Sequence, residues 1–505
     1  MRLFEMLVLI ALFASVMGFF IPRKNRPRFL VFLPAAAAVF ALVHIVLEGY
    51  RFQMAPAYIL TGTLLVIFFF RIRKRAEKPK PASKGLKVLR IVTLFLGFLF
   101  FAIAVLLPAL MPIVNLPQPS GSFSVGKTSF HFVDKNRLET LTEDPGDYRE
   151  FDAYVWYPAD PSKESEVLPY KIHQPRVGSI LGAGPDPAPA GPPDFVFSHL
   201  KYMKSNAHPD APVASKAGPF PVIGFSCGFL SDPDEYQLQF EELASHGYIV
   251  FSLNQPYESH SVVHADGRVV PFAPFHAEEF HRCSKTALRL WEKYAETPDA
   301  EERKLITREI LEAETFMDRV FRIRTADMQH TVNELIEMNA GTRSSLFRGR
   351  LDLTRLGVFG HSGGGAVAGQ CCVTDPRFKA GVNMDGFQFG DVIDGEVHQP
   401  FMFMYSEQFT EANAAMMESF KNTIYVCTIK GSLHMDFSDN PFVLPITKRM
   451  GMSGKIPAKR MTNIINIYLL SFFDKHLKGK PSSLLDGPSG DFPEVSIKIW
   501  GSDLD

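Results

Sequence analysis

The sequence has no surplus of charge of either sign. Its 505 residues carry 53 lysines and arginines against 54 aspartates and glutamates, so the formal net charge is −1. Proteins that bind nucleic acid through its phosphates carry a surplus of basic residues, at least over part of their surface. The overall composition therefore gives no support to a nucleic-acid partner, and we expect none.

Cysteines and glycosylation acceptors are also scarce. The five cysteines are Cys227, Cys283, Cys371, Cys372 and Cys427. An odd number with one adjacent pair does not fit a disulfide framework. Cys371 and Cys372 stand among small residues, where we expect them to be buried as small hydrophobes. The absence of any Asn-x-Ser/Thr acceptor favours a bacterial envelope protein over a large exported eukaryotic domain.

Long apolar runs occur only near the N-terminus. Four of them lie within residues 1–116, at about 3–20, 29–47, 55–70 and 91–114. Each approaches the roughly 20 residues that cross a bilayer as a helix. A signal peptide would be a single run followed by mature sequence. Charged residues border these runs and hardly enter them, which favours four transmembrane helices over the core helices of a soluble domain.

The charges between these runs predict their orientation. The second loop, around Glu48 and Arg51, is nearly neutral. The first and third loops are basic, with Arg23, Lys24, Arg26 and Arg28 in the first and eight lysines and arginines between residues 71 and 87 in the third. Because basic loops stay in the cytoplasm, residues after about 116 are expected on the extracytoplasmic face.

Residues 117–505 alternate between apolar runs typical of buried strands and patterns typical of helices. The strands are expected at 220–226, 248–254, 355–360, 379–385, 400–406 and 423–431, and helices at about 236–245, 364–373 and 411–420. Continuous apolar strands that alternate with helices predict a parallel α/β sheet.

Two insertions interrupt this alternation. Residues 162–218 are rich in proline, glycine and alanine, which predicts a loop. Residues 275–340 are charged and helical in pattern. They form either a cap over a substrate site or a solvated helical cover on one face of the sheet.

The segment Gly360-His361-Ser362-Gly363-Gly364 fits the G-x-S-x-G pattern of a nucleophile elbow. An expected strand precedes it and an expected helix follows it, which is the setting that this motif requires. The glycines at 360 and 364 are expected because side chains there would collide with the neighbouring strand and helix. We therefore predict that Ser362 is a nucleophile presented above the carboxyl ends of the strands.

A serine nucleophile needs a base, and His434 is the best candidate. Three histidines follow Ser362, namely His398, His434 and His476. In α/β hydrolases the order along the chain is serine, acid, histidine. His434 lies in a loop directly after an expected strand, where this fold carries its base. His398 precedes a strand, and His476 lies near the end of a helix.

Two carboxylates could orient the base. Asp385 ends the strand that follows the elbow, and Glu407 ends the next one. Asp385 is preferred because Gly386 gives the chain a tight exit that exposes the carboxylate, but the spacing alone leaves both open. Asp436 is too close to His434 along the chain to reach beneath its ring.

The oxyanion of an acyl-transfer intermediate needs two N–H donors. One is expected from Gly363, the residue after the nucleophile. The other is expected from Phe229, in the loop after the strand 220–226, where Gly228 permits close approach of the backbone.

These segments resemble the platelet-activating factor acetylhydrolases of the plasma and intracellular type II group. The matching stretches include "GFSCGFLSDPDEYQLQFEELASHGYIV", "RLGVFGHSGGGAV", "DPRFKAGVNMDGF" and "IKGSLHMDFSD", in order along the domain. The resemblance implies an α/β-hydrolase fold, a mostly parallel sheet with helices on both faces, and chemistry without cofactor or metal ion. It assigns Ser362 as nucleophile, Asp385 as acid, His434 as base, and Phe229 and Gly363 as oxyanion donors.

The chain departs from this family at several points. Cys227 stands where the family often has histidine, and Gly363 where a bulky residue often follows the nucleophile. The four apolar runs are not part of the plasma enzyme. The loop 162–218 falls where that enzyme carries a lipid-surface helix, and only "FVFSHLKYMK" offers an apolar equivalent.

The sequence thus predicts a multi-pass membrane protein with an outward-facing serine ester hydrolase domain. The resemblance implies cleavage of short or oxidised acyl chains from the sn-2 position of phospholipids, so a lipid-like ester and the bilayer are the expected partners. A general carboxylesterase or dienelactone-type hydrolase is a second hypothesis. An inactive hydrolase-like membrane scaffold is a third. The sequence does not predict the oligomeric state.

Overall fold

The chain forms two compact units. The computed structural model describes residues 1–505 except 19, 22–24, 26, 74–83, 171–193, 260, 265, 272–273, 410–411 and 502–505. One unit comprises Met1–Val114 with the segments Phe195–Tyr202 and Val443–Ile446, and the other comprises the rest. This division lies close to the expected boundary at residue 116. Arg23, Lys24 and Arg26, which help to predict the orientation, lie outside the described residues.

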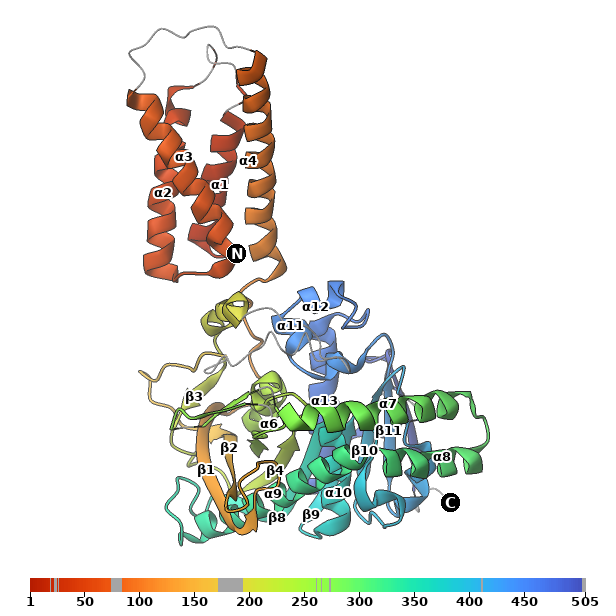
Figure 1. Ribbon diagram of the computed structural model, residues 1–505. Helices are drawn as coiled ribbons and strands as arrows, with labels where there is room; N and C mark the ends of the chain where they lie inside the picture. The colour runs from red at the N-terminus through yellow and green to blue at the C-terminus, as the bar shows by residue number, and fades with distance from the viewer. Residues whose placement is uncertain are drawn as a thin grey trace. The chain divides into compact units, whose positions relative to one another are not determined.

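Among the described residues of the N-terminal unit, four α-helices lie side by side (Figure 1). They are α1 (Leu3–Gly18), α2 (Leu33–Val43), α3 (Ala55–Arg73) and α4 (Lys84–Leu110). The segments Phe52–Phe70 and Ile91–Leu110 are long and apolar enough to cross a membrane, whereas Leu3–Gly18 and Leu33–Glu48 are shorter apolar helices. Two of the four expected spans thus have the length and composition of a transmembrane helix.

The outward faces of these helices are apolar. Ile10, Leu42, Ile59 and Phe95 are among many large hydrophobic side chains that stand exposed. A helix that packs on a soluble protein normally turns polar residues outward. Soluble monomers rarely expose so many large apolar side chains next to one another. The exposed surface of the described helices in this unit is therefore largely apolar.

One group of charges is buried inside the N-terminal unit. Glu5 of α1 is fully buried and receives two hydrogen bonds from Arg51, at 3.0 and 3.1 Å. His44 lies 3.5 Å from Glu5 and is hydrogen-bonded to Tyr58. Because an unpaired charge is very unfavourable in an apolar interior, each of these groups is satisfied by a neighbour.

The second unit is organised around a ten-stranded sheet of order β12-β11-β10-β9-β8-β4-β5-β2-β1-β3. Its six central strands are parallel. They are β4 (Phe220–Ser226), β5 (Ile249–Leu253), β8 (Leu351–His361), β9 (Phe378–Met384), β10 (Phe401–Ser406) and β11 (Ile424–Ile429). All six match strands expected from the apolar runs.

The outer strands of the sheet were not expected. They are β1 (Ser124–Leu138), β2 (Tyr148–Ala159), β3 (Ala207–Pro209) and β12 (Val495–Trp500). β1, β2 and β12 run antiparallel to the neighbours toward the sheet centre. In β1 and β12 buried positions alternate or mix with exposed ones, so these strands lack the continuous apolar runs of the central strands. β2 is mostly buried and does carry such a run, from Ala153 to Ala159. A separate hairpin joins β6 (Ser261–Val263) and β7 (Val269–Pro271).

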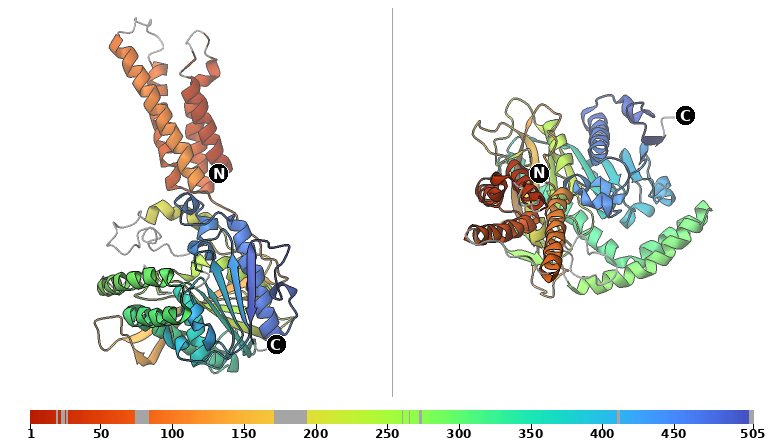
Figure 2. Two further views of the ribbon diagram at one scale, coloured as in Figure 1. Left: turned by 90° about the vertical axis from the view of Figure 1, so that its right-hand side faces the viewer. Right: turned by 90° about the horizontal axis from the view of Figure 1, so that it is seen from above.

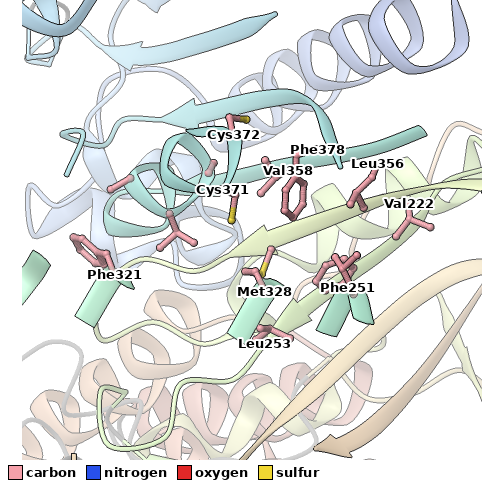
Figure 3. Close-up of a cluster of buried hydrophobic side chains, with 14 of the residues drawn as sticks. Val222, Phe251, Leu253, Phe321, Met328, Leu356, Val358, Cys371, Cys372 and Phe378 are labelled. Atoms are coloured by element: carbon pink, nitrogen blue, oxygen red, sulfur yellow. The ribbon is translucent and has the colours of Figure 1, made fainter. Parts of the chain in front are cut away.

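Helices cover both faces of the sheet (Figure 2). The main helices of this unit are α6 (Gln237–Ser245), α7 (Pro274–Glu296), α8 (Ala300–Ala313), α9 (Thr315–Ala340), α10 (Gly363–Thr374) and α13 (Ala458–Lys478). Successive residues of a strand point to opposite faces. Val358 therefore joins the core beneath α9 and α10 (Figure 3), whereas Phe359 joins the core beneath α6 and α13.

Both insertions contain regular secondary structure. Residues 275–340 fall in α7, α8 and α9. In 162–218 the described residues include a 3-10 helix, Asp194–Tyr202, and β3, while 171–193 lie outside the described residues. The expected helical segment at 411–420 is a 3-10 helix, Ala414–Ser419, within the described residues. All five cysteines are free and buried.

A buried ionic network fastens the helical insertion to the sheet. Arg149 of β2 donates to Asp327 of α9 at 2.7 Å and to Glu139 at 2.9 Å. Arg137 reaches the other oxygen of Asp327 at 2.6 Å. These two carboxylates raise the pKa of Arg149 against the effect of its burial, so the guanidinium stays charged. Asp327 is therefore the point at which two strand arginines hold α9.

Replacing Asp327 with alanine should destabilise the second unit strongly. It leaves two buried or half-buried guanidinium groups without their shared carboxylate, and breaking a buried pair in this way costs about 3–5 kcal/mol. Urea unfolding followed by fluorescence measures the change. The control Asp394→Ala removes an exposed pair with Arg308 and should leave the midpoint unchanged. Equal midpoints for both variants would contradict this account of how α9 is held.

Candidate active site

Ser362 lies at the turn between β8 and α10. Its backbone has a positive φ, which is uncommon for any residue other than glycine. Its φ and ψ are 57° and −126°. The Ser362 N–H donates to the carbonyl oxygen of Met384, at the end of β9, over 2.8 Å. Such strain costs on the order of 1–3 kcal/mol and persists where the surrounding structure enforces it. The serine is thereby held at the carboxyl edge of the sheet.

The elbow glycines have a direct steric reason. A Cβ at Gly360 would overlap the carbonyl group of Gly364, and a Cβ at Gly364 would overlap the carbonyl group of Ser226. Both obstacles are backbone atoms, which cannot rotate away as a side chain can. Helix α10 therefore approaches β4 and β8 closely only because both positions lack a side chain.

The structure brings His434 and Asp385 together. Nδ1 of His434 donates to Oδ2 of Asp385 over 2.8 Å. Asp385 is fully buried and also accepts the N–H of Ser406 at 2.6 Å and its hydroxyl at 3.1 Å. The imidazole is 40% exposed, so one side of the ring faces solvent. This arrangement fixes the tautomer of His434 and leaves Nε2 as its basic atom.

The other candidate residues lie elsewhere. Glu407 accepts the N–H of Gly431 at 3.0 Å, and Asp385 is the partner of Nδ1 of His434. His398 is 69% exposed and lies beside Glu396. His476 lies in helix α13 and is hydrogen-bonded to Tyr425 of β11. Asp436 accepts the N–H groups of Leu433 and Gly454, both at 2.7 Å, and so shapes the loop that carries His434.

His361, the residue before the nucleophile, connects the two loops of the site. The sequence motif leaves this position open, so we did not expect a role for it. Burial, together with the nearby His434 ring, holds the pKa of His361 well below its usual range, so it is neutral. It donates from Nε2 to the carbonyl oxygen of His434 at 3.0 Å and accepts at Nδ1 the hydroxyl of Tyr236 at 2.9 Å. The Tyr236 oxygen in turn accepts the N–H of Gly228 at 3.4 Å.

The loop after β4 lies next to the serine. A Cβ on Gly228 would stand 3.4 Å from the Cβ of Ser362. Arg324 of α9 donates to the carbonyl oxygen of Cys227 at 3.0 Å and to Glu258 at 2.6 Å. The arginine fixes the peptide that precedes Gly228 and Phe229. Gly363 opens helix α10, where the first N–H groups have no acceptor within the helix.

Aromatic side chains from the helical insertion stand around these groups. The ring of Phe321 lies where a Cβ on Gly363 would be. Phe229 packs against Phe280 of α7 and Phe316 of α9, with ring centroids 5.0 and 5.9 Å apart. Phe321 also packs against Phe389, 5.2 Å away. The insertion thus supplies an apolar wall beside the candidate nucleophile and the loop after β4.

The two carboxylates that the sequence left open can be separated by the reactivity of Ser362. Asp385→Asn keeps the size of the side chain but lets His434 take the wrong tautomer, so labelling of Ser362 by a fluorophosphonate should slow by up to about 10⁴-fold. Glu407→Gln should label at the rate of the unchanged protein. Labelling rates are measured by in-gel fluorescence, with circular dichroism to verify folding. The reverse order of rates would assign the role to Glu407.

Comparisons with known proteins agree with this architecture. The chain matches the family Platelet-activating factor acetylhydrolase, isoform II, over residues 110–483. The platelet-activating factor acetylhydrolase of Cavia porcellus is 28% identical over 377 residues, covering 72% of this chain and 78% of that protein. The enzyme of Bos taurus is 26% identical over 414 residues, covering 77% and 81%.

Two further proteins extend these comparisons. A probable 1-alkyl-2-acetylglycerophosphocholine esterase of Arthroderma benhamiae is 29% identical over 164 residues, covering 28% of this chain and 42% of that protein. A solved ferulic acid esterase from Streptomyces cinnamoneus shares the fold, with a TM-score of 0.57 and 24% identity over 76% of this chain and 99% of that one. The chain belongs to the platelet-activating factor acetylhydrolase isoform II family and is a carboxylic ester hydrolase.

Proposed function

We propose that this protein is a membrane-anchored serine hydrolase that removes short or oxidised acyl groups from the sn-2 position of phospholipids. The observation that carries the proposal is the 2.8 Å hydrogen bond between His434 and the buried Asp385, beside the strained turn of Ser362. An imidazole oriented by a carboxylate is what a serine hydroxyl needs to become a nucleophile near neutral pH.

In the first half of the reaction Ser362 Oγ attacks the ester carbonyl while Nε2 of His434 accepts the hydroxyl proton. Asp385 stabilises the imidazolium that forms and does not itself become protonated. His434 then gives the proton to the departing lysophospholipid alcohol, which leaves an acyl group on Ser362. In the second half a water molecule attacks the acyl-enzyme with His434 again as base, and the acid is released.

The negative charge on the carbonyl oxygen forms beside two backbone donors, the N–H groups of Gly363 and Phe229. The N-terminal end of α10 adds a favourable dipole at the same place. Removing one such donor typically costs on the order of 100- to 1000-fold in rate. The hydrogen bonds of Arg324 and Tyr236 to the loop after β4 support this role, because they fix the loop before substrate arrives.

The choice of substrate rests on the aromatic wall and on family membership. Relatives of this chain carry the name platelet-activating factor acetylhydrolase, which describes an acetyl ester. The ring of Phe321 stands against Gly363, and Phe229 packs with Phe280. Rings this close to the serine offer apolar surface to an acyl chain and would crowd a long one.

The helices of the N-terminal unit are proposed to hold the enzyme in the bilayer from which its substrate comes. Their exposed apolar side chains and the two segments of spanning length support this role. We propose four spans, with the hydrolase unit on the extracytoplasmic face, because basic residues gather in the first and third loops. A tether of this kind raises the effective concentration of lipid substrate at the site.

The substrate proposal is tested with the purified protein in mixed micelles and a series of phosphatidylcholines that differ only in the sn-2 acyl chain. The acetyl ester should be hydrolysed more than about 10-fold faster than a long-chain ester, since apolar pockets discriminate chain length by this order. Release of the acyl group is measured by mass spectrometry.

The control Ser362→Ala should lower kcat by about 10⁶-fold, as loss of the nucleophile does in other serine hydrolases. If p-nitrophenyl acetate is hydrolysed but no phospholipid of the series is, the enzyme is a general carboxylesterase. If Ser362 does not react with a fluorophosphonate either, the chain is an inactive scaffold.

The orientation is tested by adding a protease to bacterial spheroplasts that carry the protein with a C-terminal tag. The tagged hydrolase unit should be cut from the outside, because basic loops keep the other side of the helices in the cytoplasm. Cleavage only after lysis would reverse the orientation. A cytoplasmic marker protein that stays intact in the same sample verifies that the spheroplasts are closed.

A further inference from the structure

A second cluster of titratable side chains lies on β1, β2 and the segment after β6. His131 of β1 pairs across the sheet with Asp152 of β2, and Glu150 precedes Asp152 by two residues on the same face. His264 follows β6. Asp152 and His264 are buried, whereas the side chain of His131 is one-third exposed. One ligand atom from each of His131, Asp152 and His264 can be chosen so that all three lie within 4.8 Å of one another.

Asp152 sets the orientation of both imidazoles. Nδ1 of His131 and Nδ1 of His264 each lie 2.8 Å from a different oxygen of this carboxylate. A carboxylate can only accept, so both Nδ1 atoms carry a proton, and in the neutral form of each ring Nε2 then presents a lone pair. Asn254 holds Asp152 in place, since it donates to Oδ2 and accepts the Asp152 N–H, both at 2.8 Å.

The two Nε2 atoms face a second carboxylate without a hydrogen bond. Nε2 of His131 lies 3.5 Å from Oε2 of Glu150, and Nε2 of His264 lies 4.0 Å from Oε1. In the described part of the chain the buried Nε2 of His264 has no hydrogen-bond partner. Lone pairs turned toward a carboxylate repel it unless a cation stands between them. Ligand atoms about 2.0–2.1 Å from one tetrahedral zinc ion are roughly 3.3 Å apart. The 3.5 Å separation is close to this value, and the 4.0 Å separation would have to shorten when the ion binds.

Arg268 completes the surroundings of Glu150. Its guanidinium holds Oε1 at 2.6 Å and Oε2 at 3.2 Å, and its side chain is half exposed. Ligating carboxylates and imidazoles are usually oriented by such outer hydrogen bonds, and here Asp152 and Arg268 both provide them. The exposed edge of His131 gives an ion a path from solvent.

We propose that His131, His264 and Glu150 bind a divalent transition-metal ion of the zinc type, with Asp152 as the carboxylate that orients both imidazoles. Two imidazoles and one carboxylate suit zinc and its neighbours in the first transition row and are a poor set for Mg²⁺ or Ca²⁺. A water molecule fills the remaining position on the side of His131.

The ion has a structural role and takes no part in ester hydrolysis. His264 belongs to the segment that returns from β5, and the same segment contacts the loop after β4. Ser259 donates to the carbonyl oxygen of Ser231 at 2.9 Å and pairs with Leu230 in an isolated bridge. Binding of the ion thus ties β1 and β2 to the segment that braces the oxyanion loop.

The test uses the full-length protein in detergent, stripped with EDTA and dialysed. Titration with Zn²⁺ in a calorimeter should give one site per chain, and a Tm that rises with Zn²⁺ but not with Mg²⁺. His264→Gln and His131→Gln should each weaken zinc binding by more than about 10-fold. Glutamine can still donate to Asp152, and circular dichroism of each variant verifies the fold.

The matched control is His398→Gln, which removes an exposed histidine outside the cluster and should bind Zn²⁺ as the unchanged protein does. Binding that is unaffected by either cluster variant would overturn the proposal, because the zinc would then be held elsewhere. Absence of any zinc binding, with a Tm that rises instead as the pH is lowered from 8 to 6, would show that a proton rather than a metal ion stands between the imidazoles and Glu150.

Discussion

The close approach of helix α10 to the ends of β4 and β8 is the constraint on which the rest of the site depends. Gly360 and Gly364 face backbone carbonyl groups, so no rotation could make room for a side chain. The approach forces Ser362 to a positive φ and directs its N–H to the end of β9. The same approach brings the start of α10 beside the loop after β4. One packing contact therefore determines where the hydroxyl, the helix dipole and the oxyanion loop stand relative to one another.

Two buried side chains of the site, Asp385 and His361, have their hydrogen-bond partners in place without any substrate. Asp385 receives three hydrogen bonds, from Ser406 and His434. His361 remains neutral because burial lowers its pKa, and only a neutral ring can donate at one nitrogen and accept Tyr236 at the other. A protonated ring could no longer accept the Tyr236 hydroxyl at Nδ1, so this arrangement of donors and acceptors requires a pH above the pKa of His361. This preorganisation is the source of electrostatic stabilisation in enzymes of this kind.

The sequence predicted the parts of the fold whose apolar residues are continuous. The six central strands are buried on both faces, and their pattern needs no tertiary information. β1 and β12 were missed because these antiparallel outer strands mix polar and apolar positions. β2 was missed although Ala153–Ala159 is a continuous apolar run. The spacing could not choose between Asp385 and Glu407, because both end strands at the same edge. The choice follows from the sheet itself, which puts Asp385 beside His434 and the N–H of Gly431 beside Glu407. Nothing in the G-x-S-x-G pattern indicated the role of His361, since that position is variable in the motif.

The departure at Gly363 has a physical explanation that links the helical insertion to the chemistry. Where the family often has a bulky residue, the space beside Ser362 is taken by the ring of Phe321, which comes from α9. The aromatic group is thus supplied by an inserted helix in place of the residue that follows the nucleophile. Asp327 and Arg324 fix α9 to the sheet and to the loop after β4, so the position of this ring depends on these buried hydrogen bonds. A change that displaces α9 would therefore move the ring of Phe321 relative to Gly363 while Ser362, Asp385 and His434 stay the same.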